Sequence, residues 1–228
     1  MKKISIVVPA KNEERGIKKF LTELTKEFSD SEIIVVCNGC TDRTPSIVKQ
    51  MTQKNLRMID ISENIGKGAA ILEGFSVAKN DLIGFVDADG AFTASAIKKI
   101  VSEIGTSDCV IASKWKGREI FSVEELPLNR KIYSKIWNQL VKAILDLNFS
   151  DTQAGLKFLK REAFEAIDQN FLCRGYDFDI ELLYKLQKNG FKIKEVSMPF
   201  RVVKKDRSLT VTDVSKMFYN LIKLRWSI

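Results

Sequence analysis

Four short apolar segments alternate with helix-like segments between residues 3 and 89, and this alternation restricts the possible folds more than any other feature. The apolar segments have strand character and cover Lys3–Pro9, Glu32–Val36, Leu56–Ile61 and Leu82–Val86. Apolar residues recur at helical spacing from Ile17 to Phe28, and further helices are predicted over Thr44–Gln53 and Gly66–Ala78. A β-α-β-α-β-α-β order is typical of an α/β protein with a mostly parallel sheet. Because the strands are almost continuously apolar, helices are expected on both faces of the sheet.

The second half of the chain is less regular. Its predicted elements are a helix at Ala94–Glu103, a strand at Cys109–Ala112, a loop at Lys116–Pro127, a long helix at Leu128–Leu147, a helix at Asp177–Lys188 and a strand at Phe191–Val196. From Val211 onward an apolar stripe is interleaved with Lys216, Lys223 and Arg225. We therefore expect a domain over residues 1–210 and an amphipathic helix over residues 211–228, which packs on the domain or faces a membrane.

Charge narrows the class of partner. The chain has 37 basic and 29 acidic residues, which favours a nucleic acid, a phosphate-bearing substrate or an anionic membrane surface. The basic residues do not interleave with aromatic residues as a stacking groove requires, so no nucleic acid is expected. No apolar run reaches the roughly 18 residues of a membrane-spanning helix, and nothing resembles a signal peptide. A cytoplasmic location is therefore expected.

The chain contains no histidine. This excludes the most common general base near neutral pH, and also nucleophile pairs of the Ser-His and Cys-His kinds. Cys37 and Cys40 form a C-x-x-C pair, but no second pair stands ready to complete a zinc site. Catalysis would therefore depend on carboxylates, cations or a metal ion.

Two carboxylates, Asp87 and Asp89, directly follow the apolar segment Leu82–Val86. Ligands of α/β proteins collect at the carboxyl ends of the strands, so both side chains are expected at the mouth of a site. Mg²⁺ is commonly held by one or two carboxylates together with substrate phosphates, which suits an ion that bridges a diphosphate. The alternative for such a pair is an Asp-rich turn with solvated side chains.

The other three predicted strands of the first half also end in polar or small residues. Pro9–Glu13 follows the first strand, where an Asn and a Glu could bond a ribose or a base, and Asn38–Asp42 follows the second. Asn64–Gly68 follows the third strand and opens a helix, where glycines and Lys67 would form a phosphate cradle. Each segment alone is also explained by a turn or a helix cap. The four strand ends together indicate a site for a nucleoside diphosphate.

The sequence resembles the family 2 glycosyltransferases, which have the GT-A (Rossmann-like) fold. The resemblance rests on Ile6–Glu13, Asn38–Asp42, Asn64–Gly68 with Ala70 and Gly74, and Val86–Gly90. Three further segments resemble the dolichyl-phosphate glucose and mannose synthases, with forms closer to the glucosyl type: Asp151–Phe158, Tyr176–Leu183 and Glu195–Val196. The resemblance extends from residue 3 to about residue 200.

The resemblance implies a role for each matching position. The nucleoside pocket would be lined by Pro9, Lys11, Glu13, Val36 and Asn38, and the diphosphate would be held by Asp87, Ala88 and Asp89, beside the Lys67 of the predicted phosphate cradle. A divalent metal ion, Mg²⁺ or Mn²⁺, would bind Asp87 and Asp89. Asp89 and Arg130 would be the catalytic residues, and the acceptor phosphate would meet Lys114, Arg130, Arg201 and Lys204. The family commonly has Asp where Asn38 stands, and Lys114 replaces an arginine, which clamps phosphate better than lysine does.

The expected activity is metal-dependent, inverting transfer of a hexose, glucose or mannose, from UDP-glucose or GDP-mannose to a polyprenyl (dolichyl) phosphate. The protein would bind peripherally to the cytoplasmic face of the membrane. A phosphate monoester is largely dianionic near pH 7 and attacks without a base, which agrees with a chain that lacks histidine. One alternative is a glycosyltransferase that acts on a glycan or protein hydroxyl with Asp151 as base, although Asp151 is better explained as a structural residue. The other is a non-enzymatic nucleotide-binding protein.

Overall fold

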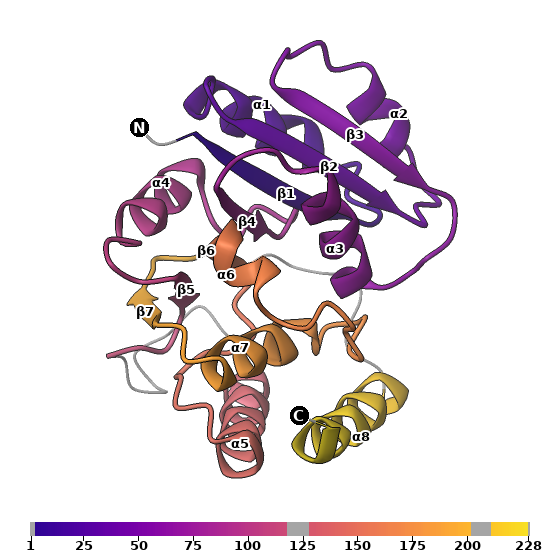
Figure 1. Cartoon of the computed structure of the whole chain (residues 1–228). Coiled ribbons are helices and arrows are strands. Elements are labelled where there is room, and N and C mark those ends of the chain that lie inside the picture. Colours follow the sequence, from indigo (N-terminus) through magenta and orange to yellow (C-terminus); the bar gives the residue numbers. More distant parts are fainter. Residues whose placement is uncertain (1–2, 118–127, 202–210, 228) are drawn as a thin grey trace.

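The structure is a computed structural model that describes residues 3–117, 128–201 and 211–227. In these residues, seven strands form one sheet in the order β3-β2-β1-β4-β6-β5-β7 (Figure 1). The strands are β1 (Ile4–Ala10), β2 (Glu32–Asn38), β3 (Leu56–Ile61), β4 (Leu82–Val86), β5 (Cys109–Ser113), β6 (Leu156–Lys160) and β7 (Ile193–Ser197). Neighbouring strands are parallel, except that β6 runs antiparallel to both β4 and β5. The predicted α/β class with a mostly parallel sheet is confirmed.

Helices cover both faces of the sheet, as predicted. They are α1 (Ile17–Glu27), α2 (Thr44–Lys49), α3 (Lys67–Val77), α4 (Ala94–Ser102), α5 (Leu128–Leu145), α6 (Arg161–Glu165), α7 (Phe178–Lys188) and α8 (Val211–Ser227). Apolar side chains of α1, α2 and α4 pack into one core cluster with Ile6 and Val8 of β1. Those of α3, α5, α6, α7 and α8 pack into a second cluster with Val7. Because successive residues of β1 enter opposite clusters, the sheet lies between two helical layers.

The sequence pattern does not predict β6 or α6. In β6, Leu156 and Phe158 face the first cluster and Leu159 faces the second, but Lys157 between them is also fully buried. A lysine is rarely buried unless it is paired, and here it interrupts the apolar run by which the other strands are found. The predicted strands are confirmed with bounds that differ by no more than two residues, whereas α2 ends at Lys49 instead of Gln53.

The long helix α5 is apolar on its exposed side as well as on its buried side. Ile132 and Ile136 are 43% and 53% exposed, whereas Val141 and Leu145 are buried in the second cluster. The apolar stripe that predicts this helix therefore does not coincide with its core-facing side in the first two turns.

The helix α8 divides its apolar residues between the protein and the solvent. Met217, Leu221 and Leu224 are buried, and α8 contacts α5 in the lower part of the molecule as drawn in Figure 1. The exposed apolar side chains of α8 are Val214, Phe218, Tyr219, Ile222 and Trp226. No helix among the described residues has both the length and the apolarity to traverse a bilayer.

Candidate active site

The carboxyl ends of four parallel strands meet at one edge of the sheet. Pro9 in β1 lies beside Val36 in β2, and Val36 lies beside Ile59 in β3, so these three strands end at a common level. β4 runs parallel to β1 on the other side. The strand ends bring these predicted residues to the same edge: Pro9, Lys11, Glu13, Asn38, Lys67, Asp87, Ala88 and Asp89.

A row of four alternating charges runs from the core to this edge, and we call it the charge row: Lys157, Asp179, Lys67 and Asp87. Lys157 Nζ pairs with Asp179 Oδ1, and Asp179 Oδ2 lies 3.3 Å from Lys67 Nζ. Lys67 Nζ in turn lies 2.9 Å from Asp87 Oδ1. Burial alone would lower the pKa of Lys67, but the carboxylates of Asp179 and Asp87 outweigh burial and raise that pKa above its ordinary value. Lys67 is therefore a cation beside Asp87 throughout the physiological pH range.

Two members of the charge row are missed by reasoning from the sequence. Asp179 is explained equally well as a carboxylate at the start of a helix, and Lys157 enters only as part of a motif that resembles the family. Lys157 and Asp179 are 0% and 1% exposed as side chains, so each is tolerated only because the other neutralises it. A lysine inside the otherwise apolar segment Leu156–Leu159 is the signal that could have indicated a buried acidic partner.

Asp87 and Asp89 fit a hard divalent cation. Both side chains are half-buried just beyond β4, and Gly155 leaves room beside Asp87, because a Cβ there would lie 2.0 Å from Asp87 Oδ2. Asp89 Oδ1 accepts the Ala91 amide at 3.0 Å, which orients that carboxylate. In the described part of the chain, no three His, Cys, Asp or Glu side chains gather into a metal site. The remaining ligands of an ion on Asp87 and Asp89 would come from a diphosphate and water, as is common for Mg²⁺.

The amino end of α3 is not the open phosphate cradle that the sequence indicates. The amides of Gly68 and Ala69 donate to the carbonyl oxygens of Gly175 and Arg174, each at 3.2 Å. Gly66, with φ +94°, approaches the same segment so closely that a Cβ would lie 2.2 Å from the Arg174 oxygen. These two amides therefore already have acceptors within the protein. The group of this motif that lies next to Asp87 is the Lys67 ammonium.

Asn38 and Val36 lie beneath the site and not on its surface. The Asn38 side chain is buried, its Nδ2 donates to the Gly66 oxygen at 3.0 Å, and its Oδ1 accepts the Ile65 amide at 2.9 Å. An aspartate at this position could accept from Ile65 but could not donate to Gly66. Val36 is fully buried in the second core cluster. In this conformation both residues are buried behind the surface of the predicted nucleoside pocket.

Hydrogen bonds tie the loop after β1 to the loop after β2. Asn12, with φ +56°, donates through Nδ2 to Thr41 Oγ1 at 3.1 Å and accepts the Thr41 amide at 2.8 Å. The Glu13 amide donates to Thr44 Oγ1 at 2.8 Å. The two loops therefore form one surface, on which Pro9, Lys11 and Glu13 are half-buried.

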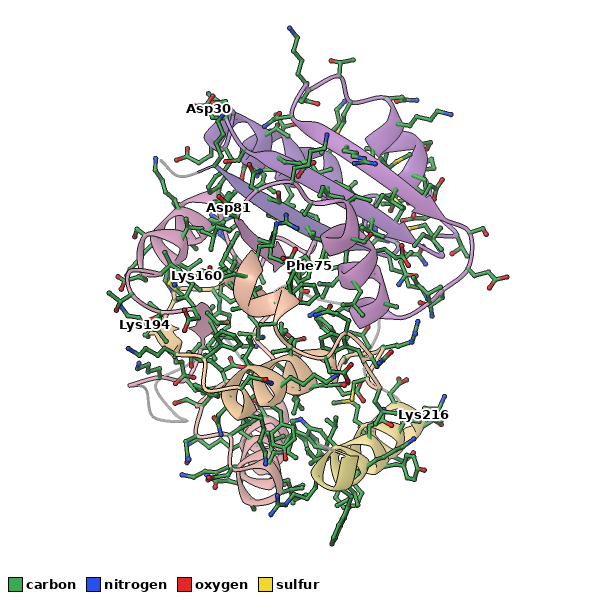
Figure 2. All side chains as sticks on the ribbon, viewed as in Figure 1. Asp30, Phe75, Asp81, Lys160, Lys194 and Lys216 are labelled. Carbon is green, nitrogen blue, oxygen red and sulfur yellow. The ribbon has the colours of Figure 1, made fainter. Side chains whose placement is uncertain are left out.

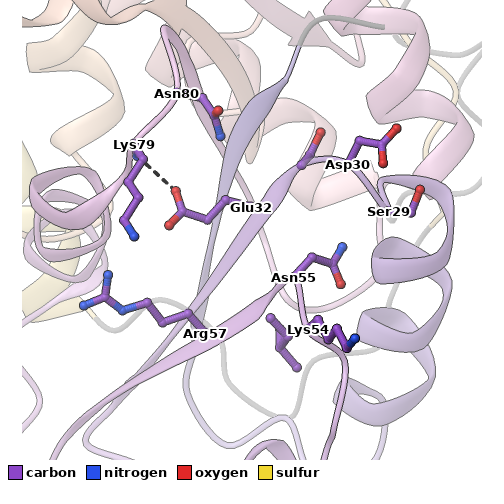
Figure 3. Close-up of a pocket in the computed structure, with 10 residues that line it drawn as sticks. Ser29, Asp30, Glu32, Lys54, Asn55, Arg57, Lys79 and Asn80 are labelled. Carbon is purple, nitrogen blue, oxygen red and sulfur yellow. Dashed lines mark hydrogen bonds between the residues drawn. The ribbon is translucent and has the colours of Figure 1, made fainter.

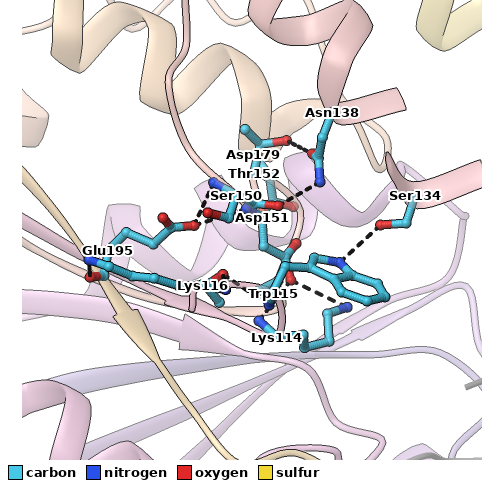
Figure 4. A network of polar contacts seen from close by, with 12 residues as sticks. Lys114, Trp115, Lys116, Ser134, Asn138, Ser150, Asp151, Thr152, Asp179 and Glu195 are labelled. Carbon is cyan, nitrogen blue, oxygen red and sulfur yellow. Dashed lines mark hydrogen bonds and ion pairs between the residues drawn. The ribbon is translucent and has the colours of Figure 1, made fainter. Parts of the chain in front are cut away.

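A second polar network holds the segment that follows β5 (Figure 4). Asp151 Oδ2 accepts the Lys114 amide at 3.1 Å and lies 3.8 Å from Lys114 Nζ. Glu195 Oε1 accepts the amides of Ser150 and Asp151, at 2.8 and 2.9 Å. Because Asp151 is only 2% exposed and is occupied by Lys114, the structure favours the structural explanation of Asp151 over its use as a base.

The same network fixes α5. Trp115 Nε1 donates to Ser134 Oγ at 3.2 Å, and Asn138, one turn further along α5, accepts from Thr152 Oγ1 at 3.1 Å. Asn138 Nδ2 also donates to the Ser150 oxygen at 2.8 Å. These contacts connect α5 to the ends of β5 and β6.

The predicted acceptor residues are placed only in part. Arg130 lies in the first turn of α5, four residues before Ser134, but its side chain is outside the described part of the structure. The Arg201 amide donates to the Ala91 oxygen at 2.8 Å, and its side chain is exposed, so Arg201 lies beside the segment that carries Asp89. Lys204 falls outside the described residues. The positions at which binding of an acceptor phosphate can be tested are therefore Lys114, Arg201 and the first turn of α5.

A pocket of about 540 Å³ lies at the opposite edge of the sheet (Figure 3). It is lined by residues at the amino ends of β2 and β3, among them Glu32 and Arg57, and by Lys79, which precedes β4. Glu32 Oε2 already accepts the Lys79 amide at 3.0 Å and the Ser5 hydroxyl at 2.8 Å. Since ligands of α/β sheets collect at the carboxyl ends of strands, this pocket is not the candidate active site.

The fold is that of solved GT-A glycosyltransferases. Glucosyl-3-phosphoglycerate synthase from Mycobacterium tuberculosis, in complex with Mn²⁺, UDP and phosphoglyceric acid, superposes with a TM-score of 0.74 at 21% sequence identity. The superposition covers 100% of this chain and 79% of that protein. The same enzyme in complex with Mg²⁺ and UDP gives a TM-score of 0.72.

The sequence is also similar to curated glycosyltransferases. It is 27% identical to the glycosyltransferase AglD of Haloferax volcanii over 99% of this chain, which spans only 37% of AglD. It is 28% identical to the dolichyl-phosphate beta-glucosyltransferase of Saccharomyces cerevisiae and to that named ALG5D of Trichomonas vaginalis, over 97% of this chain and 74% and 72% of those proteins. Residues 5–168 match the family described as Glycosyl transferase family 2. With strand ends, paired carboxylates and fold in agreement, the chain belongs to glycosyl transferase family 2.

Proposed function

We propose that the chain transfers a hexose from a nucleoside diphosphate sugar to a polyprenyl phosphate, with the assistance of a divalent metal ion. The carboxylates of Asp87 and Asp89 beside Lys67 suit a metal-bound diphosphate. The names of the eukaryotic relatives support dolichyl phosphate as the acceptor and glucose as the sugar. Structural neighbours in complex with UDP-glucose and Mn²⁺ support a uridine donor.

The proposed phosphate acceptor is supported by the burial and the hydrogen bonding of Asp151. A hydroxyl acceptor usually needs a base, and Asp151 is buried and bonded to Lys114. A phosphate monoester, largely dianionic near pH 7, needs no base and is attracted by cations such as Lys114, Arg130 and Arg201. The acceptor side of this site therefore suits an anion better than it suits a neutral hydroxyl.

The residues divide the reaction between two sides of the site. An oxygen of the acceptor phosphate forms a bond to the anomeric carbon, while the bond from that carbon to the β-phosphate oxygen breaks and its electrons pass to the diphosphate. Attack from the opposite face inverts the anomeric centre. Asp87 and Asp89 would hold the metal ion, which supplies Lewis-acid stabilisation of the leaving diphosphate. Lys67 adds positive charge beside that diphosphate, and Arg130 orients the attacking phosphate.

We further propose that α5 and α8 bring this site to the cytoplasmic face of an anionic membrane. Ile132, Tyr133 and Ile136 of α5 are exposed, and α8 exposes Phe218, Tyr219 and Trp226. Lys216, Lys223 and Arg225 are also exposed on α8, where Figure 2 labels Lys216. An amphipathic helix with aromatic residues and adjacent Lys and Arg is typical of an interfacial helix. Such binding would be peripheral and reversible.

An assay of two donors against three acceptors tests the function. UDP-glucose and GDP-mannose are each combined with a short polyprenyl phosphate, an oligosaccharide and 3-phosphoglycerate. We expect product from polyprenyl phosphate, with UDP-glucose preferred, loss of activity in chelator and recovery with Mg²⁺ or Mn²⁺. Product from the oligosaccharide or 3-phosphoglycerate alone would contradict the proposed acceptor.

The metal site is tested by a matched pair of substitutions in the same assay. Asp89→Asn should reduce turnover by about two orders of magnitude or more, because loss of the metal removes several kcal/mol of charge stabilisation. Asp30→Asn, an exposed aspartate at the opposite edge of the sheet, is the control and should be unaffected. Full activity in excess chelator would exclude the metal.

A further inference from the structure

Lys67 occupies the position from which it can compete with a metal ion for Asp87. Its ammonium lies 2.9 Å from Asp87 Oδ1 and is only 14% exposed as a side chain. A divalent ion on the same carboxylate would be placed next to this cation, and like charges at such short range repel strongly where water is largely excluded. In the structure, the negative charge of Asp87 is therefore already compensated.

Asp179 prevents Lys67 from simply leaving when a metal ion arrives. Lys67 Nζ lies 3.3 Å from Asp179 Oδ2, and Asp179 is held by Lys157 on its other oxygen. Asp179 and Lys157 are both buried, so this anchor cannot turn toward solvent. Lys67 can therefore release Asp87 and still remain at the edge of the site, bonded to Asp179.

The charges of the row explain why the metal ion and the diphosphate would bind together. The two lysines and two aspartates of the row balance, and Asp89 adds one negative charge to the metal site, so a divalent ion alone would leave one excess positive charge. A nucleoside diphosphate brings the negative charge that both the ion and Lys67 need. The ion and the diphosphate should then bind together much better than either binds alone, and by thermodynamic linkage each should strengthen the other equally.

We propose that Lys67 is a resident counter-cation of the metal site, which opposes metal binding to Asp87 until a nucleoside diphosphate is present and then pairs with that diphosphate while anchored to Asp179. This inference rests on the metal site of the proposed function and adds a reason why the ion and the donor bind together. Through Lys67, the site would bind the complex of metal ion and nucleotide more tightly than the free ion.

Direct binding of Mn²⁺ tests this proposal without an activity assay. Free Mn²⁺ is measured by electron paramagnetic resonance in solutions of the full chain, with and without UDP. For the unaltered protein we expect weak binding of Mn²⁺ alone and a strengthening by UDP of about 5- to 150-fold, the usual range of such couplings. Lys67→Met should bind Mn²⁺ alone several-fold more tightly and should lose most of the strengthening by UDP. Lys98→Met, which removes an exposed lysine paired with Glu27, is the matched control and should change neither quantity.

Two further variants separate this effect from general damage. Lys67→Gln keeps a hydrogen-bond donor toward Asp179 without the charge and should behave as Lys67→Met does. Asp179→Asn frees Lys67 to pair with Asp87 alone and should shift the affinity for Mn²⁺ in the opposite direction, toward weaker binding. Thermal unfolding of each variant shows whether it is folded. General damage would weaken Mn²⁺ binding in all three variants.

The outcomes distinguish this inference from the function on which it rests. If the unaltered chain binds no Mn²⁺ even with UDP, the proposed metal site itself is wrong. If the unaltered chain binds Mn²⁺ with UDP, but folded Lys67→Met and Lys67→Gln bind Mn²⁺ alone no more tightly, the metal site stands and the counter-cation role of Lys67 is overturned.

Discussion

Gly155 lies directly against Asp87. The Gly155 carbonyl oxygen accepts the Asp87 amide at 2.9 Å, and a Cβ at Gly155 would lie 2.0 Å from Asp87 Oδ2. Gly155 immediately precedes β6, the antiparallel strand beside β4. The strand that carries Lys157 therefore also determines where the Asp87 carboxylate can lie.

Gly155→Ala should displace the Asp87 carboxylate and weaken metal binding. Overpacking of a tight contact costs about 1–3 kcal/mol, and a comparable loss at the metal site would reduce turnover about 5- to 150-fold. Mn²⁺ binding in the presence of UDP and steady-state turnover are the measurements. Gly16→Ala is the matched control, because a Cβ at Gly16 has no atom within 4 Å and should leave both quantities unchanged. Normal metal binding by Gly155→Ala would show that Asp87 does not need this support.

Cys40 should be the most reactive of the four thiols. A hydrogen bond from the Cys37 thiol lowers the pKa of Cys40 to about 7, whereas burial raises the pKa of Cys109 to about 12 and that of Cys173 also upward. The thiolate is the reactive form, and Cys40 gains it as pH rises through about 7. Alkylation of Cys40 by iodoacetamide, followed by mass spectrometry, should therefore accelerate between about pH 6 and pH 8 and level off above that range.

Cys40→Ser provides the control for that experiment and should remove the fast phase. UDP should slow alkylation, since Cys40 lies in the loop after β2, where its sulfur is 3.5 Å from the Ala10 oxygen beside the predicted nucleoside pocket. A rate that still rises steeply above about pH 8.5, as for an ordinary cysteine, would contradict the lowered pKa.

Arg130 should matter for the acceptor and not for the donor. Hydrogen bonds to charged groups contribute about 1.5–3 kcal/mol, so Arg130→Ala should lower kcat/KM for polyprenyl phosphate by about one to two orders of magnitude. Arg130→Lys should recover only part, because one ammonium cannot replace the planar two-donor guanidinium. Kinetics with each substrate varied in turn are the measurement, with Lys142→Ala in the last turn of α5 as control. Equal losses for donor and acceptor would show that the acceptor site is elsewhere.

Patterns within short segments predict much of the fold and place Asp87 and Asp89 at the candidate metal site. The strands β1, β2 and β4 are mostly apolar and β3 is apolar at four of its six positions, so these runs, the intervening helices and the polar residues at the carboxyl ends can be read directly. Asp87 and Asp89 follow from this placement alone. In contrast, β6 contains a buried lysine, and its partner Asp179 lies 22 residues away. A local sequence pattern does not contain the distant partner that neutralises such a charge.

The roles of Asn38 and Lys67 depend on contacts between distant segments, which local patterns do not contain. Asn38 bonds to a loop 27 and 28 residues further along the chain. Lys67 meets Asp179 across 112 residues. The amides of α3, which would form a phosphate cradle in isolation, are occupied by the Arg174–Gly175 segment. Sequence therefore identifies the polar residues at the edge, whereas the structure shows which of their groups are already bonded within the protein.

The exposed side of α8 should bind anionic vesicles in a salt-dependent manner. Trp226 is 85% exposed, and Lys216 lies on the same helix. A Lys near an anionic surface contributes about 1 kcal/mol, so Lys216→Gln should weaken binding to phosphatidylserine vesicles about fivefold. Trp226→Ser should weaken it through loss of apolar burial. Sedimentation at low and high salt is the measurement, since exposed charges are screened beyond about 3 Å at 1 M salt.

The helix α1 supplies the control for the vesicle experiment, because it covers the opposite face of the sheet. Lys18 is exposed on α1, and Lys18→Gln removes the same charge as Lys216→Gln without touching α8. Equal losses in the two variants would indicate attraction by the net charge alone, and no sedimentation at low salt would exclude the membrane surface.

A hydrogen bond joins α8 to the residue before α7. Asn220 Nδ2 donates to Asp177 Oδ2 at 2.6 Å, and Asp177 lies two residues before Asp179 of the charge row. A membrane-bound α8 would therefore hold the charge row at a fixed orientation to the lipid surface, from which a polyprenyl phosphate acceptor would project.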